Sequence, residues 1–174
     1  MRLAALITTL SLLSTAAAAQ QVTYDYDRGT DFARFKTYAW VDGTILQDEF
    51  NHRRIVAAVD SQLKLKGFTR VERGANPDLL VAYHASFDKD LRITGFSSGW
   101  AGYRFAASRS GTARVDDVVT GTVVVDMVEA ASKTIIWRGT ARKEVDAAAS
   151  PEKREKNIHK AAEKLYRNYP PRKG

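Results

Sequence analysis

The stretch Leu79-Leu80-Val81-Ala82-Tyr83-His84-Ala85-Ser86-Phe87 decides the fold of this chain. Its odd-numbered positions are all apolar or aromatic, and its even-numbered positions mix apolar residues with His84 and Ser86. Alternation with a period of two is typical of a β-strand. Because both sets contain apolar residues, we expect a strand that is at least partly covered on both faces.

Five further segments carry strand patterns: residues 22–27, 36–41, 68–72, 114–128 and 134–145. The last two are joined by residues 129–133, so they are expected to form an antiparallel hairpin. In that hairpin Arg138 alternates to the face opposite Trp137 and is placed to pair with Asp126 across the strands. Trp40 and Trp137, both in strands, are interpreted as core residues.

Two segments show helical periodicity instead. Between residues 48 and 66, Ile55, Val59 and Leu63 recur every four residues, and Gly67 ends the pattern. Between residues 150 and 168, Ser150 followed by Pro151 is a strong helix start. The buried stripe expected for this second helix consists of Ile158, Ala161, Ala162 and Leu165.

These elements predict an α+β fold. The expected architecture is a two-layer sandwich, in which two helices pack on one face of a mixed, mostly antiparallel sheet of about six strands. The strand–helix–strand order over residues 36–72 suits a right-handed parallel crossover.

The first 19 residues have the features of an export signal. Arg2 supplies a positive charge, residues 3–13 are mostly apolar, and Ala17-Ala18-Ala19 precedes Gln20. The apolar run is about half of the ~20 residues that cross a bilayer, and no later segment is apolar enough to span. We therefore expect cleavage near Ala19, a single α+β domain over residues 20–174, and a periplasmic or secreted protein.

Composition and motifs exclude several classes of site. The chain has no Cys, so thiol chemistry is excluded. Its formal net charge of +7 suits anionic partners, and the alternative is that this charge only keeps the protein soluble. The three His residues lack metal-binding spacing, and there is no phosphate-binding loop or G-x-S-x-G motif. We therefore expect no metal and no cofactor, and the export signal argues against nucleic acid as a partner.

Several segments together resemble a known family. They are Asp31-Phe32, Phe35-Lys36-Thr37-Tyr38-Ala39-Trp40, Leu65-Lys66-Gly67-Phe68, Pro77-Asp78-Leu79-Leu80-Val81-Ala82-Tyr83, Gly121-Thr122-Val123-Val124-Val125-Asp126 and Ile136-Trp137-Arg138-Gly139-Thr140-Ala141. In order and spacing they resemble the bacterial envelope proteins catalogued as domain of unknown function 4136. The resemblance implies a periplasm-facing α+β module, often on a lipoprotein, without an established activity or catalytic residues. This chain lacks the Cys that would carry a lipid anchor.

Residues 88–113 show no secondary-structure period and are expected to form a long loop rich in Gly and aromatic residues. The candidate ligand-binding residues lie here: Trp100, Tyr103, Arg104, Phe105 and Arg109. Aromatic rings with interleaved Arg suit a sugar, a lipid head group or a peptide. The alternative is that the rings pack over the sheet while the Arg side chains reach water.

The function expected from the sequence is that of a non-catalytic periplasmic module. It would bind another envelope component, such as an envelope protein, an anionic glycan or a lipid head group. The alternative is a small cell-envelope hydrolase that uses His84 with a nearby Ser or acid. A third interpretation is a purely structural or stress-related envelope protein without a small ligand.

Overall fold

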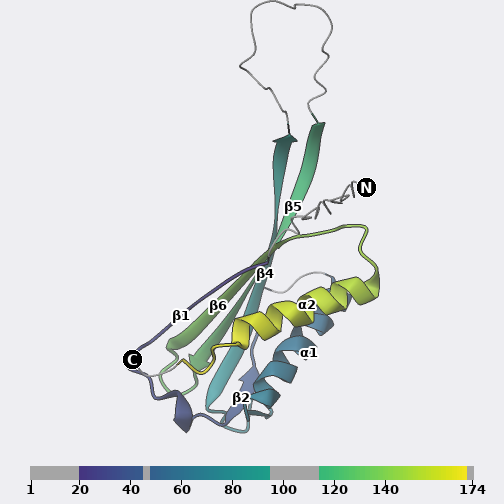
Figure 1. Cartoon of the computed structure of the whole chain (residues 1–174). Helices are drawn as coiled ribbons and strands as arrows, with labels where there is room; N and C mark the ends of the chain where they lie inside the picture. Colours follow the sequence, from purple (N-terminus) through teal and green to yellow (C-terminus); the bar gives the residue numbers. More distant parts are fainter. Residues whose placement is uncertain (1–19, 45–47, 95–113, 172–174) are drawn as a thin grey trace, which may run out of the picture.

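A computed structural model describes residues 20–44, 48–94 and 114–171 of the chain. These residues form one sheet, two α-helices and a short 3-10 turn (Figure 1). In chain order the elements are β1 (Gln21–Tyr26), η1 (Phe32–Arg34), β2 (Thr37–Trp40), α1 (Glu49–Leu65), β3 (Thr69–Arg70), β4 (Leu79–Thr94), β5 (Arg114–Glu129), β6 (Ile135–Glu144) and α2 (Pro151–Tyr166).

The sheet has six strands in the order β1-β6-β5-β4-β2-β3. The neighbouring pairs β1–β6, β6–β5 and β5–β4 are antiparallel, and β2 pairs in parallel with both β4 and β3. Both helices lie on one face of this sheet (Figure 1). The predicted α+β architecture is therefore confirmed, including the mixed, mostly antiparallel sheet and the hairpin of β5 and β6.

Both helices begin at a capping side chain, and the one at Ser150 was predicted from the sequence. The side chain of Asp48 accepts a hydrogen bond from the Asn51 N–H at 3.1 Å at the start of α1, and Ser150 accepts one from the Lys153 N–H at 3.3 Å at the start of α2. Such caps satisfy backbone donors that have no partner within the helix. Gly67, just beyond α1, has φ of +87°, which glycine adopts without a steric penalty.

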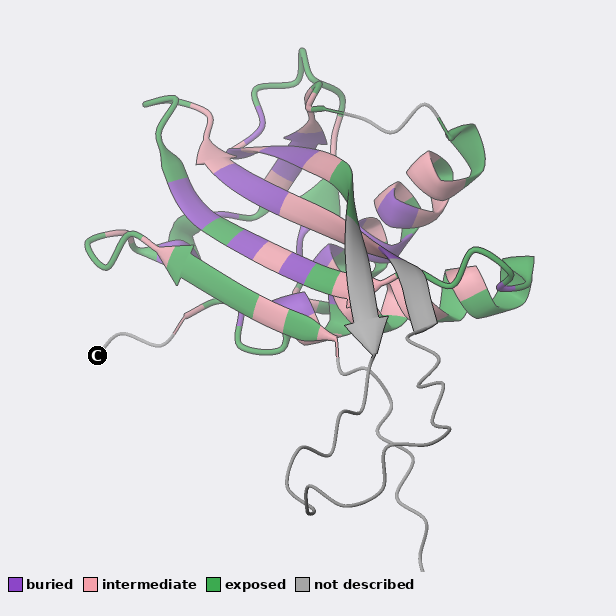
Figure 2. Cartoon of the chain, turned by 90° about the horizontal axis from the view of Figure 1, so that it is seen from above, coloured by how far each residue is buried: buried purple, intermediate pink, exposed green. Residues whose placement is uncertain are grey.

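The core lies between the helices and the sheet, and buried positions recur along the strands (Figure 2). Trp137 is 1% exposed and its ring stacks on Tyr166, with centroids 5.1 Å apart. Trp40 is half-buried at the edge of this core and donates a hydrogen bond to Asp60 at 2.8 Å. Both tryptophans thus pack in or against the core, as predicted.

Strand β4 is longer than the sequence predicts. Its pairing with β5 continues from Phe87↔Gly121 to Thr94↔Arg114, whereas β5 is last paired with β6 at Thr120↔Glu144. Beyond that point β4 and β5 form a two-stranded ribbon that extends past the helices (Figure 1). The prediction of a loop from residue 88 is therefore wrong for residues 88–94. The reason is that Asp88 and Lys89 are both exposed, so this part of β4 needs no apolar alternation.

Candidate functional site

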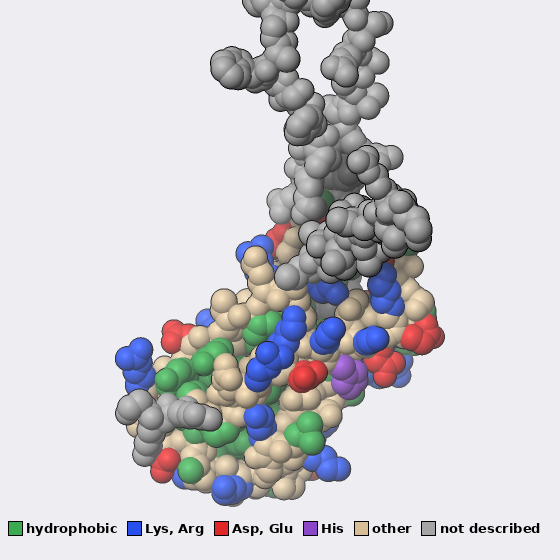
Figure 3. Space-filling model, viewed as in Figure 1, with side chains coloured by type: hydrophobic (Ala, Val, Ile, Leu, Met, Phe, Trp, Pro, Cys, Tyr) green, Lys and Arg blue, Asp and Glu red, His purple; other side chains and the backbone are tan. Residues whose placement is uncertain are grey.

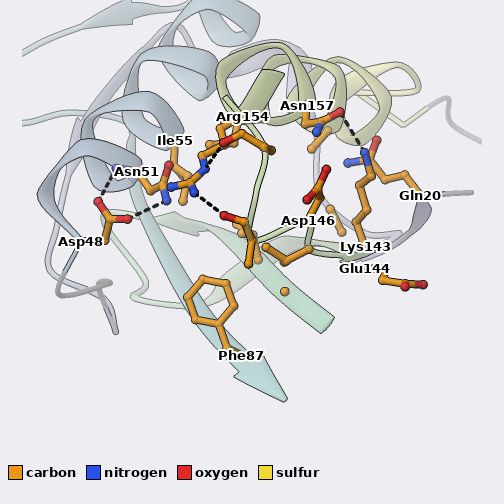
Figure 4. A pocket seen from close by; sticks show the side chains of 18 residues that line it. Gln20, Asp48, Asn51, Ile55, Phe87, Lys143, Glu144, Asp146, Arg154 and Asn157 are labelled. Carbon is orange, nitrogen blue, oxygen red and sulfur yellow. Dashed lines mark hydrogen bonds between the residues drawn. The ribbon is translucent and has the colours of Figure 1, made fainter. Parts of the chain in front are cut away.

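A pocket of about 330 Å³ opens between the helices and the sheet, near the base of the ribbon (Figure 4). Helices α1 and α2 form one wall, strands β4, β5 and β6 form the floor, and the segment that leads from β6 to α2 closes one side. The pocket thus combines residues from both layers of the fold.

Half of the eighteen residues that line the pocket have apolar side chains. They are Ile55, Phe87, Val123, Ala141, Val145, Ala147, Ala149, Ile158 and Ala161. Phe87 is 51% exposed, because it stands where β4 leaves the helical layer. The absence of a side chain at Gly121 makes room beside it, since a Cβ there would lie 2.9 Å from Val145 and 3.4 Å from the Phe87 ring.

Two cations are held at the rim of the pocket. The Arg154 side chain donates hydrogen bonds to the backbone carbonyls of Ala149 at 3.1 Å and Ala147 at 2.9 Å. The Lys143 amine donates to the Asn157 side-chain oxygen at 2.8 Å (Figure 4). These hydrogen bonds all go to neutral oxygens, so they orient the two cations without cancelling their charge.

Acidic side chains also reach the rim, and two of them have structural roles. Asp48 caps α1. Asp146 binds the Lys153 amine at 2.8 Å and the Ala148 N–H at 3.0 Å, and the hydrogen bond from Lys153 is the main reason that the pKa of Asp146 lies below its ordinary value. The rim therefore presents charges of both signs around an apolar interior.

His84 lies on the opposite, helix-free face of the sheet. Its Nδ1 is 3.0 Å from the backbone N–H nitrogen of Thr44, which donates to it, and 3.1 Å from the Thr44 hydroxyl oxygen. Because Nδ1 accepts a hydrogen bond, the neutral ring carries its proton on Nε2, which lies 3.6 Å from an Asp126 oxygen. The ring thereby links the segment after β2 to the sheet.

Asp126 forms shorter contacts with Arg138 than with His84. Arg138 donates to its two carboxylate oxygens at 2.6 and 2.7 Å, so the predicted cross-strand pair is confirmed. The pairing raises the pKa of Arg138 above its ordinary value. His84 is 42% exposed and close to a carboxylate, but within the described part of the chain its hydrogen bonds go to Thr44 and not to a serine.

The predicted ligand-binding residues Trp100, Tyr103, Arg104, Phe105 and Arg109 lie outside the described residues. So does the predicted export signal at residues 1–19. Within residues 20–44, 48–94 and 114–171, no group of three or more His, Asp or Glu side chains is arranged to hold a metal ion. No helix in those ranges combines the length and apolar character needed to cross a bilayer.

The two-layer fold and the sequence identify the family. The fold defines an α+β protein with one helix-covered and one open sheet face. The chain belongs to the family described as Domain of unknown function (DUF4136), whose model matches residues 22–171. The predicted resemblance is thus confirmed. No curated protein matches the chain.

Solved structures share the fold at low sequence identity. A DUF4136 family protein from Bacteroides thetaiotaomicron is 15% identical with a TM-score of 0.52, over 87% of this chain and 96% of that protein. A PelC dodecamer from Paraburkholderia phytofirmans is 9% identical with a TM-score of 0.51, over 85% and 95%. A PDZ domain protein from Parabacteroides distasonis is 17% identical with a TM-score of 0.55, over 90% of this chain but only 36% of that protein. The chain therefore spans about a third of the length of this last protein.

Proposed function

We propose that this protein is exported and serves in the periplasm, or outside the cell, as a non-catalytic binding or accessory module for another envelope component. The observation that carries the proposal is the apolar pocket between the helices and the sheet, with its oriented cations at the rim. The signal-like residues 1–19 support the export step.

The pocket suits an amphipathic ligand. Its volume of about 330 Å³ falls at the lower end of the range typical for small-molecule sites, roughly 300–1,000 Å³. Apolar walls favour the burial of an apolar body, and Arg154 and Lys143 offer donors to a polar or anionic end. An acyl chain with an anionic head group has both features.

A small hydrolase that uses His84 is the weaker candidate. A base of this kind needs a free ring nitrogen and a carboxylate that orients the ring. Here Nδ1 already accepts the Thr44 N–H, and both oxygens of Asp126 accept from Arg138.

The first test is titration of the purified protein with a dansyl-labelled fatty acid. We expect saturable binding with enhanced probe fluorescence, because the probe leaves water for the apolar pocket. Phe87→Ala removes a large part of the pocket's apolar floor, so we expect it to weaken binding about tenfold, which corresponds to about 1.4 kcal/mol. Since Phe87 is half-exposed, the variant should fold normally.

Phe50→Ala is the matched control. Phe50 is 65% exposed and does not line the pocket, so the affinity should not change. Non-saturable binding of the probe, or an equal loss in both variants, would show that the pocket is not the ligand site.

A further inference from the structure

We propose that the outer face of α2 binds the surface of an anionic phospholipid bilayer. This surface is separate from the pocket. It carries a row of five cations that we call the α2 cationic stripe. The stripe consists of Lys153, Lys156, Lys160, Lys164 and Arg167.

The stripe follows from the helix geometry. One residue advances an α-helix by about 100°, so these five positions fall within an arc of about 80° and extend over about 21 Å. They point away from Ile158 and Leu165, which pack toward the core. Four of the five residues are exposed and Lys164 is half-buried. Figure 3 shows Lys and Arg side chains gathered in a row on the face that carries the helices.

The positive charges within the stripe repel one another. Lys156, Lys160 and Lys164 are spaced four residues apart, and like charges at this spacing destabilise a helix. Among the described residues, an ion pair within 4.0 Å is recorded for Lys153, with Asp146, and for none of the other four. Glu152 and Glu163 lie at the edge of the stripe, but neither forms an ion pair within 4.0 Å in the described part of the chain. An external anionic surface would relieve this repulsion.

The composition of the stripe favours a lipid surface over a folded partner. Four of its five cations are Lys, which act as flexible, hydrated point charges, whereas Arg is preferred for geometrically specific, bidentate recognition. A straight row on the outermost layer suits a flat array of phosphate groups. The predicted export signal would deliver the protein to the periplasm or the cell exterior, and both adjoin a membrane surface.

The test is co-sedimentation with vesicles of phosphatidylglycerol mixed with phosphatidylcholine, compared with pure phosphatidylcholine vesicles. We expect binding to the anionic vesicles only, and its loss in about 1 M salt, where the Debye length is about 3 Å. Replacing Lys156, Lys160 and Lys164 together with Gln should weaken binding about a hundredfold, since each Lys near an anionic bilayer contributes roughly a fivefold gain in affinity.

Two further variants make the result specific. Arg28→Gln, Lys36→Gln and Arg142→Gln together remove the same charge from exposed sites off α2, and they should retain most of the binding. Changing Lys156, Lys160 and Lys164 to Arg keeps the charge and should keep the affinity. Equal binding to neutral vesicles, or an equal loss in the control, would overturn the proposal. So would capture of soluble polyphosphate by the stripe without any binding to anionic vesicles.

Discussion

Asp126 is a buried carboxylate on the face of the sheet that the helices leave open. It is 4% exposed, yet it lies on the same face as the exposed residues Asp25 and Arg138, which are register partners across β1 and β6. An ionised group shielded from water in this way is stable only when its hydrogen bonds are satisfied. The two bonds from Arg138 meet that need, so the pair fixes the register of β5 against β6.

Asp126→Asn tests this role. The amide offers only one acceptor oxygen and places a donor against the guanidinium, so we expect the free energy of unfolding to fall by about 1–2 kcal/mol in urea denaturation. The exposure of Arg138 keeps the loss from being larger. Asp25→Asn is the control, because Asp25 is exposed and should change stability little. An unchanged midpoint for Asp126→Asn would mean that the pair does not stabilise the hairpin.

At the scale of elements, the helices could be predicted almost to the residue and β4 could not. Each helix has a capping side chain and an apolar stripe within its own sequence, so local chemistry defines its ends. The outer half of β4 is held by hydrogen bonds to β5 alone, and backbone pairing leaves no periodicity in the side chains. The strand order depends on contacts between distant segments, which no local pattern encodes.

The pocket was beyond prediction for a related reason. Its lining comes from α1, α2, β4, β5 and β6 and from the segment before α2. Each of these residues fits an ordinary amphipathic pattern in its own element. Only the packing of the layers brings Phe87, Val123 and Ile158 around one cavity. Gly121 was the one local feature that could have indicated the pocket. A glycine in a strand, however, is equally compatible with a bulge or with the close approach of another segment.

The contact between α2 and β6 depends on Gly139. A Cβ at this position would lie 2.3 Å from the Trp137 ring and 2.4 Å from Leu165. We expect Gly139→Ala to lower the free energy of unfolding by about 1–3 kcal/mol, because the helix must move away from the sheet. Gly74→Ala is the matched control, since a Cβ there meets nothing within 4 Å. Equal midpoints of thermal unfolding for the two variants would show that the helix can move away from the sheet without a loss of stability.

At the scale of the whole molecule, the packed core and the ribbon are separable. Beyond the last β5–β6 pair, Thr120↔Glu144, the described parts of β4 and β5 pair only with each other. Replacing residues 91–117 with Asn-Gly should let Asp90 and Val118, which are paired, flank a tight hairpin turn. We expect the midpoint of thermal unfolding to stay within about 4 °C of the parent value. A much lower midpoint would show that the replaced segment stabilises the core. A retained midpoint would provide a folded protein for testing whether Trp100 and Arg104 contribute to binding.

If the protein is exported as proposed, the pairing of β1 with β6 also sets an order of events for its folding. Gln21 pairs with Arg142 and Tyr26 with Trp137, so the first strand to leave a translocation channel would pair only after the last strand has followed it. Until then β1, in which Val22, Tyr24 and Tyr26 alternate with polar residues, would be an unpaired strand open to pairing with other chains. Closure of this sheet edge would then be a post-translocation step, and its speed would determine how long the newly delivered chain needs protection from aggregation.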